Sequence, residues 1–385
     1  MRKAGYAIVG AAESTRIGKV PELSSMGLAL DAAVNALANA GLDAADVDGL
    51  TTGYMPPGNV AQLLGMTPAW ADNTVVGGCS WMYQLRNAMA AIAAGYCETV
   101  LITYGESGRS HGFLPNVLDL GAPGSIEQQF DLMYCSGNRT ALFAMPIARF
   151  MHETGLSEAQ LASVPVAQRK WAAMNSRAKL REPTTVDDVL ASRIIAWPIR
   201  RDMCCLVSDA GGAMVVTSAE RANDFRAPPV YVVGTGSSME TGIMSPAGVE
   251  DPLRPGLIRR SAEQAFSSAG MTPDDIDHLM IYDAFAHNPI FGLEGLGFVG
   301  FGEGGAFIAE GNTEPGGRLP MNTNGGGLCY AHSGSYGMLC MQESIRQLRG
   351  EAEAQVDGVC TSLAHGWGGF WSACATVIFS NQRGG

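Results

Sequence analysis

The feature that most constrains the fold is an internal repeat. Residues 40–50 (AGLDAADVDGL) match residues 269–279 (AGMTPDDIDHL) without a gap, and each segment follows a helical pattern and precedes an apolar run typical of a strand. Further on, the helical pattern at 338–348 and the apolar run after it resemble the helical pattern at 81–94 and its following strand. Self-similarity at both ends of a unit indicates two copies of one βαβαβ unit.

The order of elements within each copy indicates a layered α/β fold. Residues 7–10 and 99–104 have the composition of buried strands, and residues 28–40 have the period of a helix that Gly41 closes. Helices that alternate with apolar strands predict a mainly parallel sheet covered by helices. In a duplicated unit, equivalent strand ends and helix starts of both halves meet at one cleft, so we expect one site shared by the halves.

A stretch of different texture interrupts the first copy. Residues 110–200 contain glycine and proline breaks between helical patterns at 127–152, 157–177 and 185–192. Insertions of this kind commonly cover a site or contribute ligand contacts. The predicted parts are a first half at 1–109 and 201–240, a loop or lid insertion at 110–200, and a second half at 241–385.

Residues 74–80 (TVVGGCS) have the pattern of a strand-turn-helix junction. Gly77 and Gly78 allow a tight turn, and Cys79 falls at the start of the following helix. The unpaired amides and the dipole of a helix N-terminus lower the pKa of a thiol placed there, which makes Cys79 the candidate nucleophile. The alternative is a core cysteine, because the chain has nine cysteines and free cysteine is among the most buried residue types.

The second half brings candidate partners for this thiol. They lie in segments 282–287 (YDAFAH), 322–334 (NTNGGGLCYAHSG) and 364–369 (AHGWGG). His332 or His365 beside a thiol can act first as its base and then as a proton donor. Each of the two also fits a structural histidine whose hydrogen bonds are satisfied within the fold.

Backbone amides in glycine clusters can approach a reacting oxygen closely. The candidates for an oxyanion site are Asn324, Gly368 and Gly369.

Composition excludes several classes of function. The 385 residues are 46% hydrophobic and 16% charged, which indicates a well-buried globular protein. The formal net charge of −12 argues against nucleic acid and anionic membranes as main partners. No apolar run reaches the ~18 residues of a membrane span, and the N-terminal run is too short for a signal peptide, so we expect a cytoplasmic protein. The cysteines and histidines lack zinc-ligand spacing, so we expect neither a metal nor a bound cofactor.

Taken together, these segments resemble the thiolase superfamily, above all the sterol-carrier-protein type and its bacterial thiolase-like relatives. The resemblance rests on the duplicated halves, the Gly-Gly-Cys helix start, the segment 282–286, the loop 322–337 and the glycine turn 366–369. It covers essentially the whole chain, and residues 110–200 stand where thiolases carry their loop domain. It implies two βαβαβ halves in a five-layered α-β-α-β-α core, and a homodimer.

The resemblance also implies roles for individual residues. Cys79 corresponds to the acyl-accepting cysteine, although Trp81 stands where thiolases have a small residue, and an alternative register shifts this match by one residue. His332 corresponds to the activating histidine. Tyr282 replaces the asparagine that orders an oxyanion-hole water in the family. The second cysteine of thiolases is missing, and His365 is the obvious substitute for it.

These departures leave three functional hypotheses. In the first, which we favour, the chain is a 3-oxoacyl-CoA thiolase that forms an acyl-enzyme at Cys79 and uses coenzyme A as co-substrate. In the second, Cys79 is a bystander, and Tyr282, Tyr330, His332 or His365 transfers protons in a retro-aldol cleavage of a 3-hydroxyacyl-CoA. In the third, the chain is a non-catalytic CoA-binding scaffold subunit.

Substrate and partner contacts follow from the same resemblance. The insertion carries basic residues that are suited to CoA phosphates, although such residues also occur on solvated helix faces. Relatives of this type often resemble subunits that work with a small zinc-ribbon and OB-fold protein, which we include as an expected partner. The predicted contacts of acyl-CoA and CoA are Trp81, Arg177, Arg181, His287, Gly326 and Tyr330.

Overall fold

One mixed sheet links both copies of the repeat in the computed structural model, which describes residues 3–112, 124, 128–129, 139–240, 251, 253 and 256–384. The strands of the first copy are β1 (Tyr6–Glu13), β2 (Gly49–Thr52), β3 (Trp70–Asp72), β4 (Thr99–Ser107) and β7 (Asp209–Ser218). Those of the second copy are β8 (Val230–Met239), β9 (His278–Ile281), β10 (Thr361–Gly368) and β11 (Ala373–Ser380). Their order is β3-β2-β4-β7-β1-β8-β11-β10-β9, so the copies meet where β1 pairs with β8.

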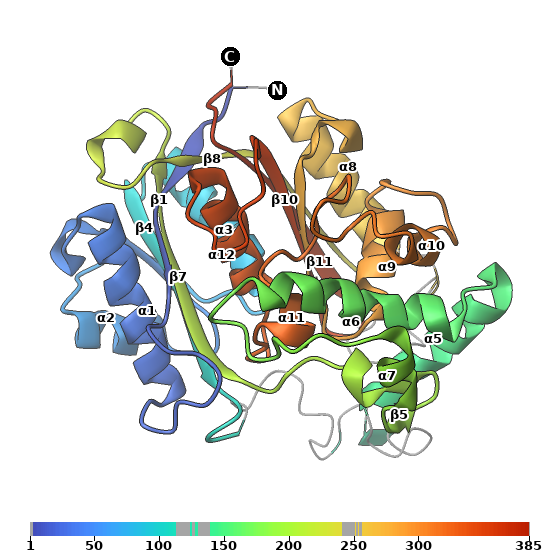
Figure 1. Ribbon diagram of the computed structural model, residues 1–385. Coiled ribbons are helices and arrows are strands. Elements are labelled where there is room, and N and C mark those ends of the chain that lie inside the picture. Colours follow the sequence, from blue (N-terminus) through green and yellow to red (C-terminus); the bar gives the residue numbers. More distant parts are fainter. Residues whose placement is uncertain are drawn as a thin grey trace.

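Helices cover both outer faces of this sheet and fill the space between its halves. They are α1 (Ser25–Ala40), α2 (Pro57–Leu64), α3 (Ser80–Ala93), α8 (Gly256–Ala269), α9 (His287–Gly295), α10 (Gly304–Ala309), α11 (Gly326–Cys329) and α12 (Gly337–Arg349). The first helix of each copy lies outside: α1 packs on β1, β4 and β7, and α8 packs on β8 and β11. In contrast, α3 and α12 contact each other and strands of both halves, so they form the central layer (Figure 1). The expected α-β-α-β-α succession is confirmed.

The sequence repeat corresponds to a repeated helix end. α1 and α8 each stop at a left-handed glycine, Gly41 with φ 78° and Gly270 with φ 64°. A single 3₁₀ turn with a capping box follows in both copies, and there Asp46 and Asp275 accept the backbone N–H three residues before them. The next strand, β2 or β9, then enters the sheet. The predicted duplication is therefore confirmed.

The prediction of a mainly parallel sheet is wrong. Strand β2 runs parallel to β3 and β4, and β9 runs parallel to β10, as the crossover helices require. However, β4 pairs antiparallel with β7, and β10 pairs antiparallel with β11. The chain reaches β11 through a short turn and β7 after the insertion, so no crossover helix forces these strands into a parallel direction.

The insertion covers the second half from one side. Its described elements are α5 (Arg139–Thr154), α6 (Glu158–Ala173), α7 (Val186–Ala191), β5 (Ile194–Ala196) and β6 (Ile199–Arg200). The helix predicted at 127–152 overlaps α5, and its residues 127 and 130–138 lie outside the described residues. Helix α6 crosses in front of the sheet and packs on α10 and α11 (Figure 1). The three-part division stays a prediction, and β8, which it assigned to the first half, pairs with both β1 and β11.

Within the described ranges, no helix has the length and apolar character needed to cross a membrane.

A buried carboxylate ties the insertion to the core. Glu13 at the end of β1 is buried, and it pairs with Arg346 of α12 at 2.8 Å and with Arg177 of the insertion at 3.2 Å. It also accepts a hydrogen bond of 2.5 Å from the hydroxyl of Tyr330. Burial alone would raise the pKa of Glu13, but the two guanidinium groups outweigh burial and lower that pKa. The predicted contacts of Arg177 and Tyr330 with CoA stay a prediction, whereas their observed partners are structural.

We expect Glu13→Gln to lower the free energy of unfolding by about 3 kcal/mol at pH 7, because it leaves Arg346 and Arg177 without their shared counter-charge. Because the pKa of Glu13 is lower in the folded state, the contribution of Glu13 is complete above about pH 4.3 and is lost as the pH falls through the folded-state value. Urea unfolding at pH 7 and pH 3 measures both effects. Glu98→Gln, which removes an exposed ion pair with Arg221, is the control and should cost no more than about 1 kcal/mol. An equal deficit for Glu13→Gln at both pH values would contradict the electrostatic origin.

Candidate active site

A cavity of about 160 Å³ lies where the two halves and the insertion meet. The first half contributes Tyr54, Gly77, Gly78 and Glu106, and the insertion contributes Leu142 and Phe143. The second half contributes Tyr282, Ala284, Phe285, Asn288, Gly334, Ser335, Trp367, Gly369, Phe370 and Trp371. The cavity thus lies between the halves, as expected of the site, and the insertion contributes to its wall. The role of the insertion as a lid stays a prediction.

The turn before α3 presents Gly78 to this cavity. Ser80 closes the turn, because its hydroxyl accepts from the N–H of Val76 at 2.9 Å and donates to the carbonyl of Gly77 at 2.6 Å. A Cβ atom on Gly78 would lie only 2.5 Å from the ring of Tyr282. The bare backbone of Gly78 is thus what allows the Tyr282 ring to pack against the turn.

Cys79 is not among the residues that line the cavity. Its side chain is fully buried, and its Sγ lies 3.9 Å from the carbonyl oxygen of Val76. A Cβ atom on Gly368 would lie 3.2 Å from the same sulfur, so the thiol is enclosed between α3 and β10. Burial, together with the nearby Cys374, raises the pKa of Cys79 well above its usual value. The expectation that the helix N-terminus lowers this pKa is therefore wrong, because desolvation dominates.

Tyr282 and His332 form a hydrogen-bonded pair at the cavity. The hydroxyl of Tyr282 lies 2.9 Å from Nε2 of His332, while Nδ1 of His332 accepts from the N–H of Gly334 at 3.3 Å. With Nδ1 acting as an acceptor, the hydrogen-bond network assigns the imidazole proton to Nε2, which donates to the phenol oxygen. Burial lowers the pKa of His332 to about 4 and raises that of Tyr282. At neutral pH both groups are uncharged, and the phenol retains its proton.

The loop that carries His332 is held by buried polar groups. The carboxylate of Asp283 accepts from the N–H groups of Gly327 at 2.7 Å and Leu328 at 3.1 Å. A Cβ atom on Gly326 would lie 2.4 Å from that carboxylate, so a glycine is required there. The side-chain oxygen of Asn324 accepts from the N–H of Gly326 at 2.9 Å. The structure thus places Asn324 and Gly326 in the support of the loop rather than on the cavity wall.

His365 is not brought to the cavity. Its Nδ1 lies 2.9 Å from the hydroxyl of Thr376, which in turn lies 2.9 Å from the hydroxyl of Ser261 in α8. Successive residues of a strand face opposite sides, so His365 points to α8 while Gly366 and Gly368 pack against the turn at Cys79. Burial lowers the pKa of His365 to about 3.

Among the predicted backbone contributors, Gly369 lines the cavity and Gly368 packs against the turn instead.

Two predicted aromatic contacts lie behind the cavity wall. Trp81 is fully buried, and its ring centroid lies 4.4 Å from that of Tyr104 and 6.3 Å from that of Tyr54. His287 is buried among aromatic rings and stacks on Phe285 at 5.8 Å. Both side chains therefore support lining residues instead of lining the cavity themselves.

Of the predicted phosphate contacts, Arg181 faces solvent. With Arg169 and Lys179 it lines a surface hollow of about 450 Å³ on the insertion. Lys179 and the residue after it are hydrogen-bonded to the carbonyl of Cys329 in α11, so this basic hollow adjoins the loop that leads to His332. A contact of Arg181 with CoA remains a prediction.

The structure adds Glu106 and Tyr54 to the candidate residues. Glu106 follows Gly105 near the end of β4, and Tyr54 comes shortly after β2. Polar residues at the carboxyl ends of neighbouring parallel strands are a recognised signal of a binding site in α/β proteins. That signal was present in the sequence, since Glu106 follows the predicted strand at 99–104 by two residues.

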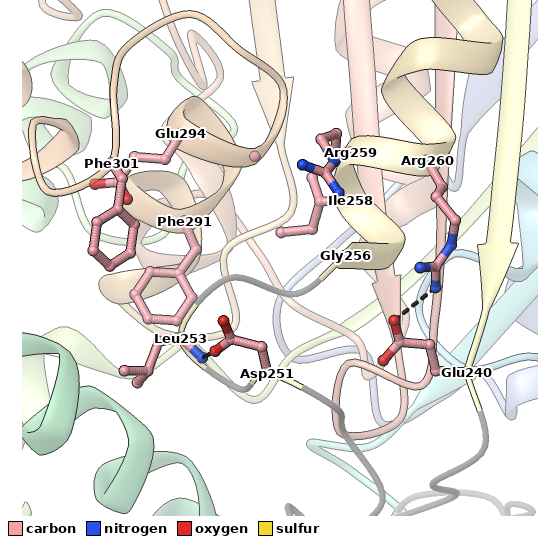
Figure 2. Close-up of a pocket in the computed structure, with 11 residues that line it drawn as sticks. Glu240, Asp251, Leu253, Gly256, Ile258, Arg259, Arg260, Phe291, Glu294 and Phe301 are labelled. Atoms are coloured by element: carbon pink, nitrogen blue, oxygen red, sulfur yellow. Dashed lines mark hydrogen bonds and ion pairs between the residues drawn. The ribbon is translucent and has the colours of Figure 1, made fainter.

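A second cavity, of about 430 Å³, lies between α8 and α9 (Figure 2). Phe291 and Phe301 form one side, and Arg260 pairs with Glu240 at 2.6 Å on the other side (Figure 2). The ring centroid of Phe291 lies 5.4 Å from that of Trp371, which lines the first cavity. The two cavities therefore border one aromatic cluster, but the second cavity contains none of the predicted catalytic residues.

Among the residues that the structure describes, no group of three or more His, Cys, Asp or Glu side chains could hold a metal ion.

Comparisons with known proteins identify the family. A family model described as "Thiolase C-terminal domain-like" matches residues 245–381. The 17-hydroxy-3-oxo-4-pregnene-20-carboxyl-CoA lyase of Mycobacterium tuberculosis is 34% identical over 92% of this chain and 94% of its own length. An acetyl-CoA acetyltransferase of Methanothermobacter thermautotrophicus is 30% identical over 97% of this chain and 99% of its own.

A solved structure, named Ltp2-ChsH2(DUF35) aldolase, superposes with a TM-score of 0.85 at 30% identity and covers 98% of both chains. The chain belongs to the thiolase superfamily, in its sterol-carrier-protein-2-like part. The names of these relatives are those of enzymes that act on CoA thioesters, and they include both acyltransferases and carbon–carbon lyases.

We expect iodoacetamide to label native Cys79 at least about 100-fold more slowly than Cys360, because the buried Cys79 thiol ionises poorly and is shielded from solvent. Peptide mass spectrometry of timed samples at pH 8 measures both rates, and labelling in denaturant gives the reference for each cysteine. Rapid labelling of native Cys79 would restore the interpretation of this residue as an accessible nucleophile.

Proposed function

We propose that this chain is a retro-aldol lyase that cleaves a 3-hydroxyacyl-CoA, the second of the two enzymatic hypotheses drawn from the sequence. One observation carries the proposal: Gly78 and Tyr282, and not Cys79, are among the residues that line the cavity. The register of the family motif is then shifted by one residue, and glycine occupies the place of the nucleophile. Among the described residues that line this cavity none is a cysteine, so a covalent acyl-enzyme would lack a thiol in that lining.

The Tyr282–His332 pair suits the protonation step of a retro-aldol reaction. Cleavage of the bond between C2 and C3 leaves the electron pair on C2 as the enolate of the thioester, which must receive a proton. A phenol with a raised pKa retains its proton until this strongly basic carbon forms, and the Nε2–H of His332 then stabilises the phenolate. The bare backbone at Gly78 and Gly369 allows the close approach that an enolate oxygen requires.

The cavity wall suggests the class of acyl group. Phe143, Phe285, Phe370 and Trp371 line one side of the cavity, and the ring centroids of Phe143 and Phe370 lie 4.5 Å apart. Such a surface favours an apolar, ring-bearing group at C3. The Mycobacterium tuberculosis relative supports this, since its name describes a lyase for a hydroxylated pregnene CoA thioester.

CoA recognition and a partner subunit belong to the same proposal. Acyl-CoA would reach the cavity with its phosphates near the basic hollow of Arg169, Lys179 and Arg181. The solved aldolase with high similarity is named together with a second protein, ChsH2(DUF35). We therefore propose a small zinc-ribbon and OB-fold partner for this chain, and a homodimer of this chain within the complex.

The alternative function is the 3-oxoacyl-CoA thiolase reaction with coenzyme A. Its support is the cysteine at the start of α3 and the acetyl-CoA acetyltransferase relative. It requires that Cys79 leave its enclosed site between α3 and β10 and become ionised, against the burial that raises its pKa.

We expect the purified protein, with a co-expressed partner where needed, to convert 3-hydroxy-3-phenylbutanoyl-CoA into acetophenone and acetyl-CoA without added CoA. Tyr282→Phe should lower kcat by about 10²- to 10⁴-fold, because the proton donor is lost. Cys79→Ala should change kcat by no more than about threefold, because the thiol does not face the cavity. Product formation followed by liquid chromatography and mass spectrometry checks each value.

The same variants separate the alternatives. Thiolysis of 3-oxobutanoyl-CoA that requires free CoA and disappears in Cys79→Ala would replace the lyase with the thiolase. Acyl-CoA binding without turnover of either substrate, in the presence and absence of the partner, would assign the chain to the scaffold class. Thermal unfolding of each variant ensures that a lost activity is not a lost fold.

A further inference from the structure

We propose that Glu106 is the general base of this site and accepts the proton of the C3 hydroxyl group. The inference rests on the proposed lyase function and supplies the residue which that function still lacks. A retro-aldol cleavage needs one group that removes the hydroxyl proton and another that protonates C2. Tyr282 is assigned to the second step, so the base must be another residue of the same cavity.

The position of Glu106 fits this role. It lies near the carboxyl end of β4, the residue is only 4% exposed, and it lines the cavity. Among the described residues that line the cavity it is the single carboxylate, and no lysine, arginine or histidine is present in that lining. A buried carboxylate on a rigid strand is well positioned for proton transfer.

Gly334 places this carboxylate beside the Tyr282–His332 pair. A Cβ atom on Gly334 would lie 2.4 Å from Oε2 of Glu106, so the carboxylate packs directly against the glycine backbone. The carbonyl oxygen of the same glycine lies 3.4 Å from the hydroxyl of Tyr282, and its N–H donates to His332. The proposed base and acid therefore lie next to the same glycine, Gly334.

The other polar groups of the cavity are poor bases. Tyr54 has a pKa raised to about 12 by burial and, to a smaller extent, by the charge of Glu106, and the pKa of Tyr282 is raised as well. His332, which is hydrogen-bonded to Tyr282 but is not part of the lining, uses Nδ1 to accept from Gly334 and Nε2–H to donate to Tyr282, so neither nitrogen offers a lone pair to a ligand. Among the described residues that line the cavity, Glu106 is therefore the one whose side chain is a good base.

Glu106 and Tyr282 together carry out every proton transfer that the cleavage requires. A carboxylate oxygen of Glu106 takes the proton of the C3 hydroxyl, the oxygen lone pair becomes the carbonyl bond of a ketone, and the bond between C2 and C3 breaks. Its electron pair forms the enolate of the thioester, whose C2 then takes the phenolic proton of Tyr282. Transfer of the proton from Glu106 to the Tyr282 phenolate restores both groups, and the products are a ketone and an acyl-CoA.

The experiment compares Glu106→Gln and Glu106→Ala with the unchanged protein on 3-hydroxy-3-phenylbutanoyl-CoA. For Glu106→Gln we expect kcat to fall by about 10²- to 10⁴-fold, with KM within about threefold, because the amide retains the shape but not the basicity. In Glu106→Ala the space left by the side chain admits a small carboxylate, so formate should restore kcat at least about tenfold in a saturable manner. Formate should not restore Tyr282→Phe, which serves as the matched control.

Each outcome has a distinct meaning. A Glu106→Gln variant that retains more than about one tenth of kcat, or a rise of KM that accounts for the whole loss, overturns the assignment of the base. A folded Glu106→Ala variant that formate does not activate also overturns it, and if this variant does not fold, Glu106→Gln decides. Absence of cleavage by the unchanged protein overturns the proposed function itself, whereas cleavage that depends on Tyr282 but not on Glu106 overturns only this inference.

Discussion

The structure depends on the close approach of two backbone turns at its centre. A Cβ atom on Gly368 would lie 1.7 Å from the carbonyl oxygen of Val76, and one on Gly77 would lie 2.8 Å from the Cα atom of Gly368. Only glycine permits this contact, which joins the turn before α3 in one half to the end of β10 in the other. The contact sets the orientation of the helix start, so that Gly78 faces the cavity and Cys79 is enclosed.

Burial then determines which chemistry the site can perform. In a region with little water the charged forms of a thiol, a phenol and an imidazole are all disfavoured. The thiol of Cys79 therefore stays protonated, His332 stays neutral, and Tyr282 keeps its proton. A site with these properties favours proton donation over attack by a sulfur anion, although the chain has a cysteine, Cys79, directly before α3.

Several parts of the fold were predictable because they rest on local rules. The repeated helix ends follow from Gly41 and Gly270 and from the capping boxes after them, all of which lie within a few residues of sequence. The pairing of β4 with β7 was not predictable in this way, because it joins strands separated by the whole insertion. Glu106 was missed for a related reason: its place in the site depends on residues of the other half, such as Tyr282 and Gly334, that only the tertiary structure brings beside it.

The sequence alone determined the duplicated unit, the thiolase-like fold, the glycine turn before α3 and the set of residues from which a site could be built. Only the tertiary structure decided which of them face the cavity. A shift of one residue at a turn or along a strand reverses the direction of a side chain, so Cys79 and His365 point into the core while Gly78 faces the cavity. That direction depends on contacts between residues of the two halves, such as the packing of Gly368 against Val76, which no local pattern encodes.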